Sequence, residues 1–278
     1  MKKKLRAILK DLSEGKISVE EAETLLKVYH IEEIEGRIKL DVSRELRSGI
    51  PEVIYAKNKD FNDIILALKR SAEENGIALA TKVREEHIIK LEKEREDILK
   101  NLNIQDYEFI VNGKASTVVL KKKDYKQEIY GKIGLLAAGT SDIPVAEEVR
   151  VTGEFLGCEV IYSYDVGIAG IHRLFEPLKR MIEEDVCCII VVAGMEGALP
   201  SVVASLVDIP VIGVPVSVGY GVGKDGKAAL YSMLTSCVPG LVVVNIDNGF
   251  GAASFAALLA RRIYRLSDNE NETSKRKD

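Results

Sequence analysis

The chain has 278 residues, which is enough for one large domain or two of ordinary size. Hydrophobic residues make up 46% of it and charged residues 29%, so the chain can bury a core and is not a disordered polymer. The net charge of -4 gives no basic field to attract nucleic acid or membrane lipid. Aromatic residues are scarce at 6%, and Trp is absent, which argues against a surface that stacks on bases.

The N-terminus begins with Met and three lysines, as a signal peptide can, but charged residues interrupt the next segment and no apolar core segment exists. No stretch reaches roughly 18 uninterrupted apolar residues, the minimum for a membrane span. We therefore expect a cytoplasmic protein with neither nucleic acid nor membrane as a partner.

Residues 1–125 are heavily charged, and we expect a helical and α+β region there. Apolar spacing predicts a helical hairpin up to about residue 28, with Gly15 ending the first helix and Ser18 capping the second. Beyond it, the pattern predicts helices over 60–75 and 85–102 and strands over 78–83, 107–111 and 116–120. Arg44 and Arg47 are interpreted either as phosphate contacts or as part of a solvated loop.

Residues 126–266 hold most of the glycines and long apolar runs, and we expect one α/β domain there, followed by a disordered tail over 267–278. Five short, β-branched runs predict strands buried on both faces, over 132–138, 158–164, 186–193, 210–215 and 241–245. Helical patterns follow them over 144–156, 171–184, 201–206, 228–236 and 252–266. Alternating strands and helices at this spacing predict a doubly wound parallel sheet of the flavodoxin-like kind.

Ligands of such sheets bind beyond the carboxyl ends of the strands, so the segments that come after the strands are the candidate site. All five are rich in glycine, four carry carboxylates, and one carries a Ser and a Tyr. Glycine lets the backbone approach a ligand, and a helix N-terminus presents free N–H groups to a phosphate. The candidate binding residues are Thr140, Ser141, Asp142, Asp165, Arg173, Gly194, Gly197, Ser217, Gly219, Tyr220, Asp247 and Asn248.

Glu196 lies between Gly194 and Gly197 at a strand end, where its carboxylate would face the cleft. It is a candidate for general acid–base work or for binding magnesium, and the alternative is a carboxylate that interacts with a helix dipole. The chain has neither a Gly-x-Gly-x-x-Gly sequence after the first of these strands nor a Walker A sequence, which argues against dinucleotide oxidoreductases and P-loop NTPases. The cysteine and histidine spacing does not suggest a zinc site.

Four stretches together resemble one known family. They are Ala138-Gly139-Thr140-Ser141-Asp142-Ile143-Pro144, Asp165-Val166-Gly167 through His172-Arg173, Gly194-Met195-Glu196-Gly197-Ala198-Leu199-Pro200, and Ser236-Cys237-Val238-Pro239-Gly240 through Asn245-Ile246-Asp247-Asn248-Gly249. The first is similar to the aminoimidazole ribonucleotide carboxylase (PurE)-like domain. In this order the four resemble the LarB family, the pyridinium-3,5-biscarboxylic acid mononucleotide synthases.

The resemblance implies a carboxylase and hydrolase acting on nicotinic acid adenine dinucleotide, in the first step of nickel-pincer nucleotide biosynthesis. CO2 or bicarbonate would supply the carboxyl group, AMP would be released, and Mg2+ would assist at the diphosphate. Cys237 matches the family's nucleophile, and Glu196 matches its Gly-Met-Glu-Gly carboxylate. It also implies a homo-oligomer, with an octamer suggested by the purine enzymes.

Two alternatives stay open at this point. A non-catalytic nucleotide-binding module would need the glycine loops without Cys237 or Glu196. A purine carboxylase is disfavoured because His172 is displaced downstream of its usual loop, and Ala198 stands where the purine enzymes have a histidine. Cys237 precedes a strand whereas the other candidates come after strands, so the sequence predicts that it lies at the opposite edge of the sheet and serves a neighbouring subunit.

Overall fold

The computed structural model describes residues 2–28, 31–34, 38–41 and 44–275. The chain begins with a helical hairpin, α1 (Lys2–Ser13) and α2 (Val19–Val28), as predicted. Ser18 caps α2 in the expected manner: its hydroxyl accepts the Glu21 N–H at 3.1 Å, and the Glu21 carboxylate accepts the Ser18 N–H at 2.9 Å. A two-stranded antiparallel ribbon and a short helix come next, β1 (Ile31–Ile34), β2 (Ile38–Asp41) and α3 (Arg44–Ser48).

The next segment forms a four-stranded sheet of order β3-β4-β6-β5 with helices packed on it. Its elements are β3 (Ile54–Tyr55), α4 (Phe61–Asn75), β4 (Ile77–Thr81), α5 (Glu85–Asn101), β5 (Tyr107–Asn112) and β6 (Thr117–Lys122). Strand β4 shows the alternation of a sheet covered on both faces. Ala78 and Ala80 pack into a core with α4 and α5, whereas Leu79 packs on the opposite face into the core of the C-terminal half.

The C-terminal half is a doubly wound sheet of five parallel strands in the order β11-β10-β9-β7-β8, which confirms the predicted fold class. The strands are β7 (Gly131–Ala137), β8 (Cys158–Ser163), β9 (Ile189–Ala193), β10 (Val211–Pro215) and β11 (Leu241–Val243). The connecting helices are α6 (Ile143–Phe155), α7 (Phe175–Glu183), α8 (Leu199–Ala204), α9 (Lys227–Leu234) and α10 (Gly249–Lys275), with short 3-10 turns η1 (Thr140–Asp142), η2 (Ile168–Arg173) and η3 (Gly221–Gly226).

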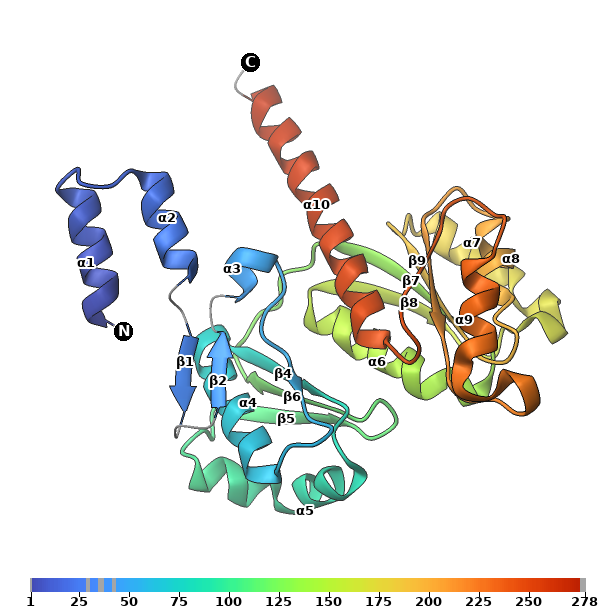
Figure 1. Cartoon of the computed structure of the whole chain (residues 1–278), viewed down its shortest axis with the longest axis horizontal. Coiled ribbons are helices and arrows are strands. Elements are labelled where there is room, and N and C mark those ends of the chain that lie inside the picture. Colours follow the sequence, from blue (N-terminus) through green and yellow to red (C-terminus); the bar gives the residue numbers. More distant parts are fainter. Residues whose placement is uncertain (1, 29–30, 35–37, 42–43, 276–278) are drawn as a thin grey trace.

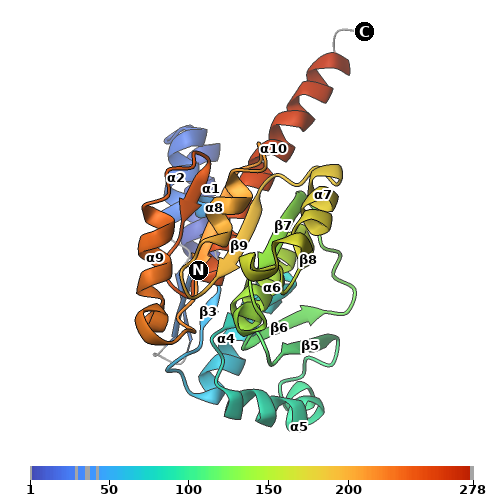
Figure 2. The same cartoon turned by 90° about the vertical axis from the view of Figure 1, so that its right-hand side faces the viewer.

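Successive side chains of the central strands enter two separate cores. Leu135 points into a core with α6 and α10, and Leu136 points into another with α7, α8 and α9. Figures 1 and 2 show these two helical layers on either side of the sheet. Because each strand is covered on both faces, the sequence reads as continuous apolar runs.

The last helix differs from its prediction. The sequence predicts disorder from residue 267, yet α10 continues to Lys275, and residues 276–278 lie outside the described part. The segment contains neither Gly nor Pro to end the helix, and the Ser267 hydroxyl donates within it to the Tyr264 carbonyl at 2.8 Å. In Figure 1 this end of α10 projects from the body of the molecule.

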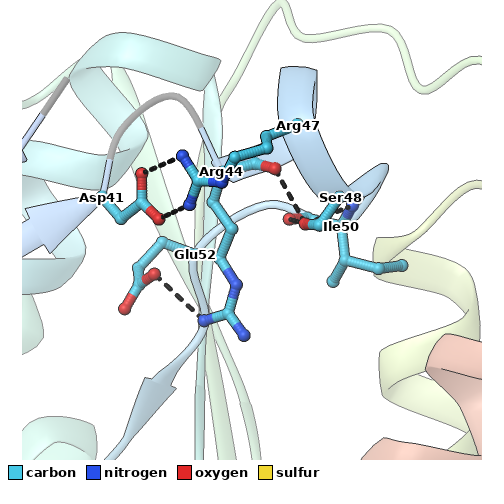
Figure 3. A network of polar contacts seen from close by, with 6 residues as sticks. All are labelled: Asp41, Arg44, Arg47, Ser48, Ile50 and Glu52. Atoms are coloured by element: carbon cyan, nitrogen blue, oxygen red, sulfur yellow. Dashed lines mark hydrogen bonds and ion pairs between the residues drawn. The ribbon is translucent and has the colours of Figure 1, made fainter. Parts of the chain in front are cut away.

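The loop around α3 is held by ion pairs. Arg44 contacts Glu52 at 3.1 Å, and Arg47 forms a two-pronged pair with Asp41, as Figure 3 shows. The sequence allowed Arg44 and Arg47 to be phosphate contacts, but in the structure both guanidinium groups pair with carboxylates of the protein. The same loop meets α10 through Arg261, which is buried and pairs with Glu45 at 3.1 Å.

No helix in the described part of the chain is long and apolar enough to cross a membrane.

Candidate functional site

A cavity of about 390 Å³ opens beyond the carboxyl ends of the parallel strands. The segments after β7, β8, β9 and β10 form its walls, which are four of the five segments that the sequence predicted. Strands β7 and β9 are neighbours, and β7 connects to β8 on one side whereas β9 connects to β10 on the other, so the loops after them diverge there. The lining residues are Ala138, Gly139, Ser141, Asp142, Gly167, Ile168, Ala169, Ala193, Gly194, Met195, Glu196, Ala198, Leu199, Val218, Gly219 and Tyr220.

Asp142 ties two walls of this cavity together. Its carboxylate accepts the Gly139 N–H at 2.8 Å and is also hydrogen-bonded by the Gly194 backbone. Burial raises the pKa of Asp142, and these backbone N–H groups oppose that rise. Because its oxygens are engaged by the backbone, Asp142 shapes the cavity, while the neighbouring Ser141 is exposed.

The segment after β9 lies close to two other loops of the cavity. A Cβ on Gly194 would lie 2.7 Å from the Val218 carbonyl oxygen and 3.1 Å from Asp142, so only glycine fits there. Met195 then adopts a left-handed backbone with a φ of 53°, which is unfavourable for a long side chain. This turn brings Glu196 into the cavity lining with its side chain exposed.

The segment after β10 forms the opposite wall. Tyr220 lines the cavity and is 78% exposed, so its ring is available to a ligand. Ser217 lies at the base of this loop, where its N–H donates to the Asp247 carboxylate at 2.9 Å. Asp247 therefore stabilises this loop through its first residue. It is not among the lining residues that the structure describes.

The remaining candidates are not among the lining residues that the structure describes. Asp165 pairs with Arg173, and neither is among the lining residues described. Thr140 and Gly197 each adjoin lining residues. Asn248 caps α10, where its side-chain oxygen accepts the Gly251 N–H at 2.9 Å.

Cys237 lies in a different place. It is exposed and lines a second cavity together with Asp208, Pro210 and Gly240, residues that precede β10 and β11. That cavity is at the amino ends of the strands, whereas Glu196 is at the carboxyl ends. The separation agrees with the position that the sequence predicted for Cys237.

Sequence reasoning missed two buried carboxylates on α6, Glu147 and Glu148. Burial opposes ionisation of Glu147, but hydrogen bonds from Arg150, Tyr164 and Asn112 outweigh it and lower its pKa to about 2. Glu148 pairs with Lys82 of the N-terminal region at 2.7 Å. The available signal was an adjacent pair of glutamates within an otherwise apolar helix start, Val145-Ala146-Glu147-Glu148-Val149.

Whether the cavity could bind Mg2+ depends on the carboxylates that it offers as ligands. No cluster of three or more His, Cys, Asp or Glu side chains suited to a metal occurs among the described residues. Mg2+ commonly takes one or two carboxylates, substrate phosphate oxygens and water. Glu196 fits that arrangement as an exposed carboxylate, whereas Asp142 does not, because backbone groups already occupy it.

The chain matches two family models and several known proteins. Residues 132–277 match the AIR carboxylase family, and residues 31–104 match the LarB/PurE-like N-terminal domain. An uncharacterised protein of Methanocaldococcus jannaschii, MJ0165, is 56% identical over 95% of this chain and 100% of its own length. The N5-carboxyaminoimidazole ribonucleotide mutase of Pyrococcus horikoshii is 35% identical over 47% of this chain and 71% of its own. The crystal structure of Treponema denticola PurE covers 52% of this chain and 93% of its own, with 25% identity and a TM-score of 0.37.

Proposed function

This chain belongs to the AIR carboxylase family in its LarB-like form, and from that premise we propose that it carboxylates the pyridinium ring of nicotinic acid adenine dinucleotide and hydrolyses the diphosphate to release AMP. The observation that carries this proposal is the composition of the cavity at the carboxyl ends of the strands. Its lining contains Glu196, Tyr220 and Ser141 together with glycines, at which the backbone is accessible to a ligand.

The absence of histidine from the lining in the described chain favours this reaction over the purine one. His172 lies in η2 and is exposed, outside the lining, and Ala198 stands before Leu199. The resemblance assigns histidines at both places to the purine carboxylases. A reaction that relies on an imidazole for proton transfer would lack that group here.

A pyridinium ring is electron-poor and does not attack CO2 by itself. We propose that the Cys237 thiolate adds to ring carbon 4, which removes the ring's positive charge and leaves an enamine that is nucleophilic at carbon 5. Carbon 5 then forms a bond to CO2. Loss of its proton and expulsion of the thiolate restore the aromatic ring, and Glu196 is the candidate acceptor of that proton.

Hydrolysis is a separate step at the diphosphate. Water adds to a phosphorus atom, the phosphoanhydride bond breaks, and AMP leaves. Mg2+ bound by Glu196 and phosphate oxygens would supply charge neutralisation at this step. Glu196 is thus proposed as either the proton acceptor or the metal ligand.

The position of Cys237 supports a site that two subunits share. Strand β10 has five residues, so it spans roughly 17 Å at about 3.3 Å per residue. One pyridinium ring cannot contact both edges of that sheet. We propose a homo-oligomer in which Cys237 of one subunit completes the cavity of its neighbour.

The test is incubation with nicotinic acid adenine dinucleotide, bicarbonate and Mg2+. We expect release of AMP together with a mononucleotide that has gained one carboxyl group, detected by mass spectrometry. 5-Aminoimidazole ribonucleotide in the same assay tests the purine alternative. Carboxylation of that compound, with none of the dinucleotide, would overturn the proposal.

A further inference from the structure

A lysine of the N-terminal region reaches the base of the cavity loops. Lys82 directly follows β4, and its backbone is left-handed with a φ of 55°. Its ammonium group lies 2.7 Å from the Glu148 carboxylate on α6 and 3.1 Å from the Asp247 carbonyl oxygen. A single side chain thus connects the four-stranded sheet, α6 and the segment after β11.

Glu148 depends on this contact. Its side chain is 1% exposed, and one carboxylate oxygen is buried without a hydrogen-bond partner in the described structure. Burial raises its pKa, while the charge of Lys82 and the backbone of Gly249 act in the opposite direction. Removing Lys82 would leave a buried carboxylate without its cation, which is a costly arrangement that the structure relieves by moving or by taking up a proton.

The segment after β11 is pressed against the same pair. A Cβ on Gly249 would lie 3.0 Å from the Glu148 carboxylate and 2.8 Å from the Val145 carbonyl oxygen. Asp247 in turn joins this segment to β10, since its N–H donates to the Pro215 carbonyl and its carboxylate accepts the Ser217 N–H, both at 2.9 Å. A continuous path of contacts therefore runs from Lys82 to the loop after β10.

The side chains at the tip of that loop are exposed. The loop contains Gly219, Gly221 and Gly223, and its larger side chains point outward, with Tyr220 78% and Val222 92% exposed. A glycine-rich segment of this kind loses much conformational entropy when a ligand orders it. Anchoring its first residue in advance reduces that cost.

We propose that Lys82 is a positioning residue: by holding Glu148 and Asp247 together it fixes the start of the loop over residues 217–223, so that the N-terminal domain sets one wall of the cavity. The role acts through Asp247 and Ser217, without contact between Lys82 and the ligand.

The absence of Trp from the chain offers a direct test. V222W places one indole on the loop, at a position outside the described cavity lining. K82M and N112A are then added separately to the full-length protein. N112A is the matched control, because Asn112 also joins the N-terminal domain to α6, at 2.5 Å from Glu147, but lies outside the Lys82–Asp247–Ser217 path.

We expect K82M to lower the fluorescence anisotropy of the indole and to increase its quenching by acrylamide, and we expect N112A to change neither. K82R keeps the charge and should restore part of the wild-type signal. Identical signals in K82M and N112A would overturn the proposal. If K82M fails to fold, E148Q supplies the test. It replaces the ion pair by a neutral hydrogen bond at nearly constant volume and should shift the signal in the same direction by less.

A kinetic arm rests on the proposed function. K82M should raise KM for the dinucleotide about tenfold while kcat stays within about twofold, because loop ordering is a binding cost. N112A should leave both unchanged. A fall in kcat alone would contradict the positioning role. If the wild-type protein does not turn over the dinucleotide, the proposed function fails, and the fluorescence arm still decides the role of Lys82.

Discussion

The separation of Cys237 from Glu196 predicts that two inactive variants restore activity when mixed. Cys237→Ser removes the proposed nucleophile, since an alcohol is a far poorer nucleophile than a thiol at neutral pH. Glu196→Gln removes the carboxylate on the opposite edge of the sheet at constant size. Each variant alone should be inactive, with its fold and its binding of the dinucleotide largely kept, because both side chains are exposed.

The size of the restored activity comes from the arrangement of the site. A complete site needs a cavity subunit with Glu196 and a neighbour with Cys237. In a 1:1 mixture with random exchange each condition is met half the time, so about a quarter of the sites are complete, whatever the closed symmetry. We therefore expect about 25% of wild-type activity if sites act independently.

The assay mixes the two variants under conditions that exchange subunits, with differently tagged copies co-purified to prove exchange. AMP release and carboxylated product are measured against each variant alone. A Cys237→Ser mixture with wild-type protein serves as the reference for exchange without complementation. An active monomer, or an inactive mixture despite proven exchange, would refute the shared site.

Glu196→Gln by itself should lower turnover by roughly two to four orders of magnitude if the residue accepts the ring proton; recovery at high Mg2+ would instead assign it to metal binding. A chain starting at Lys126 should fold poorly, measured by circular dichroism and urea unfolding, because Leu79 and Val119 are part of the C-terminal core; a truncated protein with full activity would contradict this. Glu147 has a folded pKa of about 2, below its ordinary 4.5, so its ionised form stabilises the fold above about pH 4.5 and this contribution is lost as the pH falls toward 2. Glu147→Gln should accordingly cost roughly 1 to 3 kcal/mol at pH 7 in urea unfolding and less at pH 2.5; an equal cost at both pH values would argue against the low pKa.

Local sequence was sufficient for much of the C-terminal half. Buried parallel strands are apolar runs bounded by helices, and this pattern does not depend on distant contacts. It predicted the five strands and the segments after them that form the cavity. Boundaries moved by a few residues: β9 begins at Ile189 rather than 186.

The interpretation of single side chains depended on distant partners. Asp142, Asp247 and Asn248 were predicted from their positions after strands, and the structure shows all three hydrogen-bonded to backbone N–H groups. Sequence spacing cannot tell a carboxylate that faces a ligand from one that satisfies a neighbouring loop, because both choices place a polar residue at the same strand end.

The order of elements and the edge of the sheet at which the cavity lies could therefore be inferred from the sequence alone, since both depend on local periodicity and on the handedness of strand connections. The folded structure was needed to show that Lys82 meets Glu148, 66 residues away in the chain, and Asp247, 165 residues away. The residues next to Lys82 in the sequence do not show which groups its side chain contacts. Its ion pair exists because β4 and α6 pack together in a core that includes Leu79 and Val149, and such packing is a property of the folded chain as a whole.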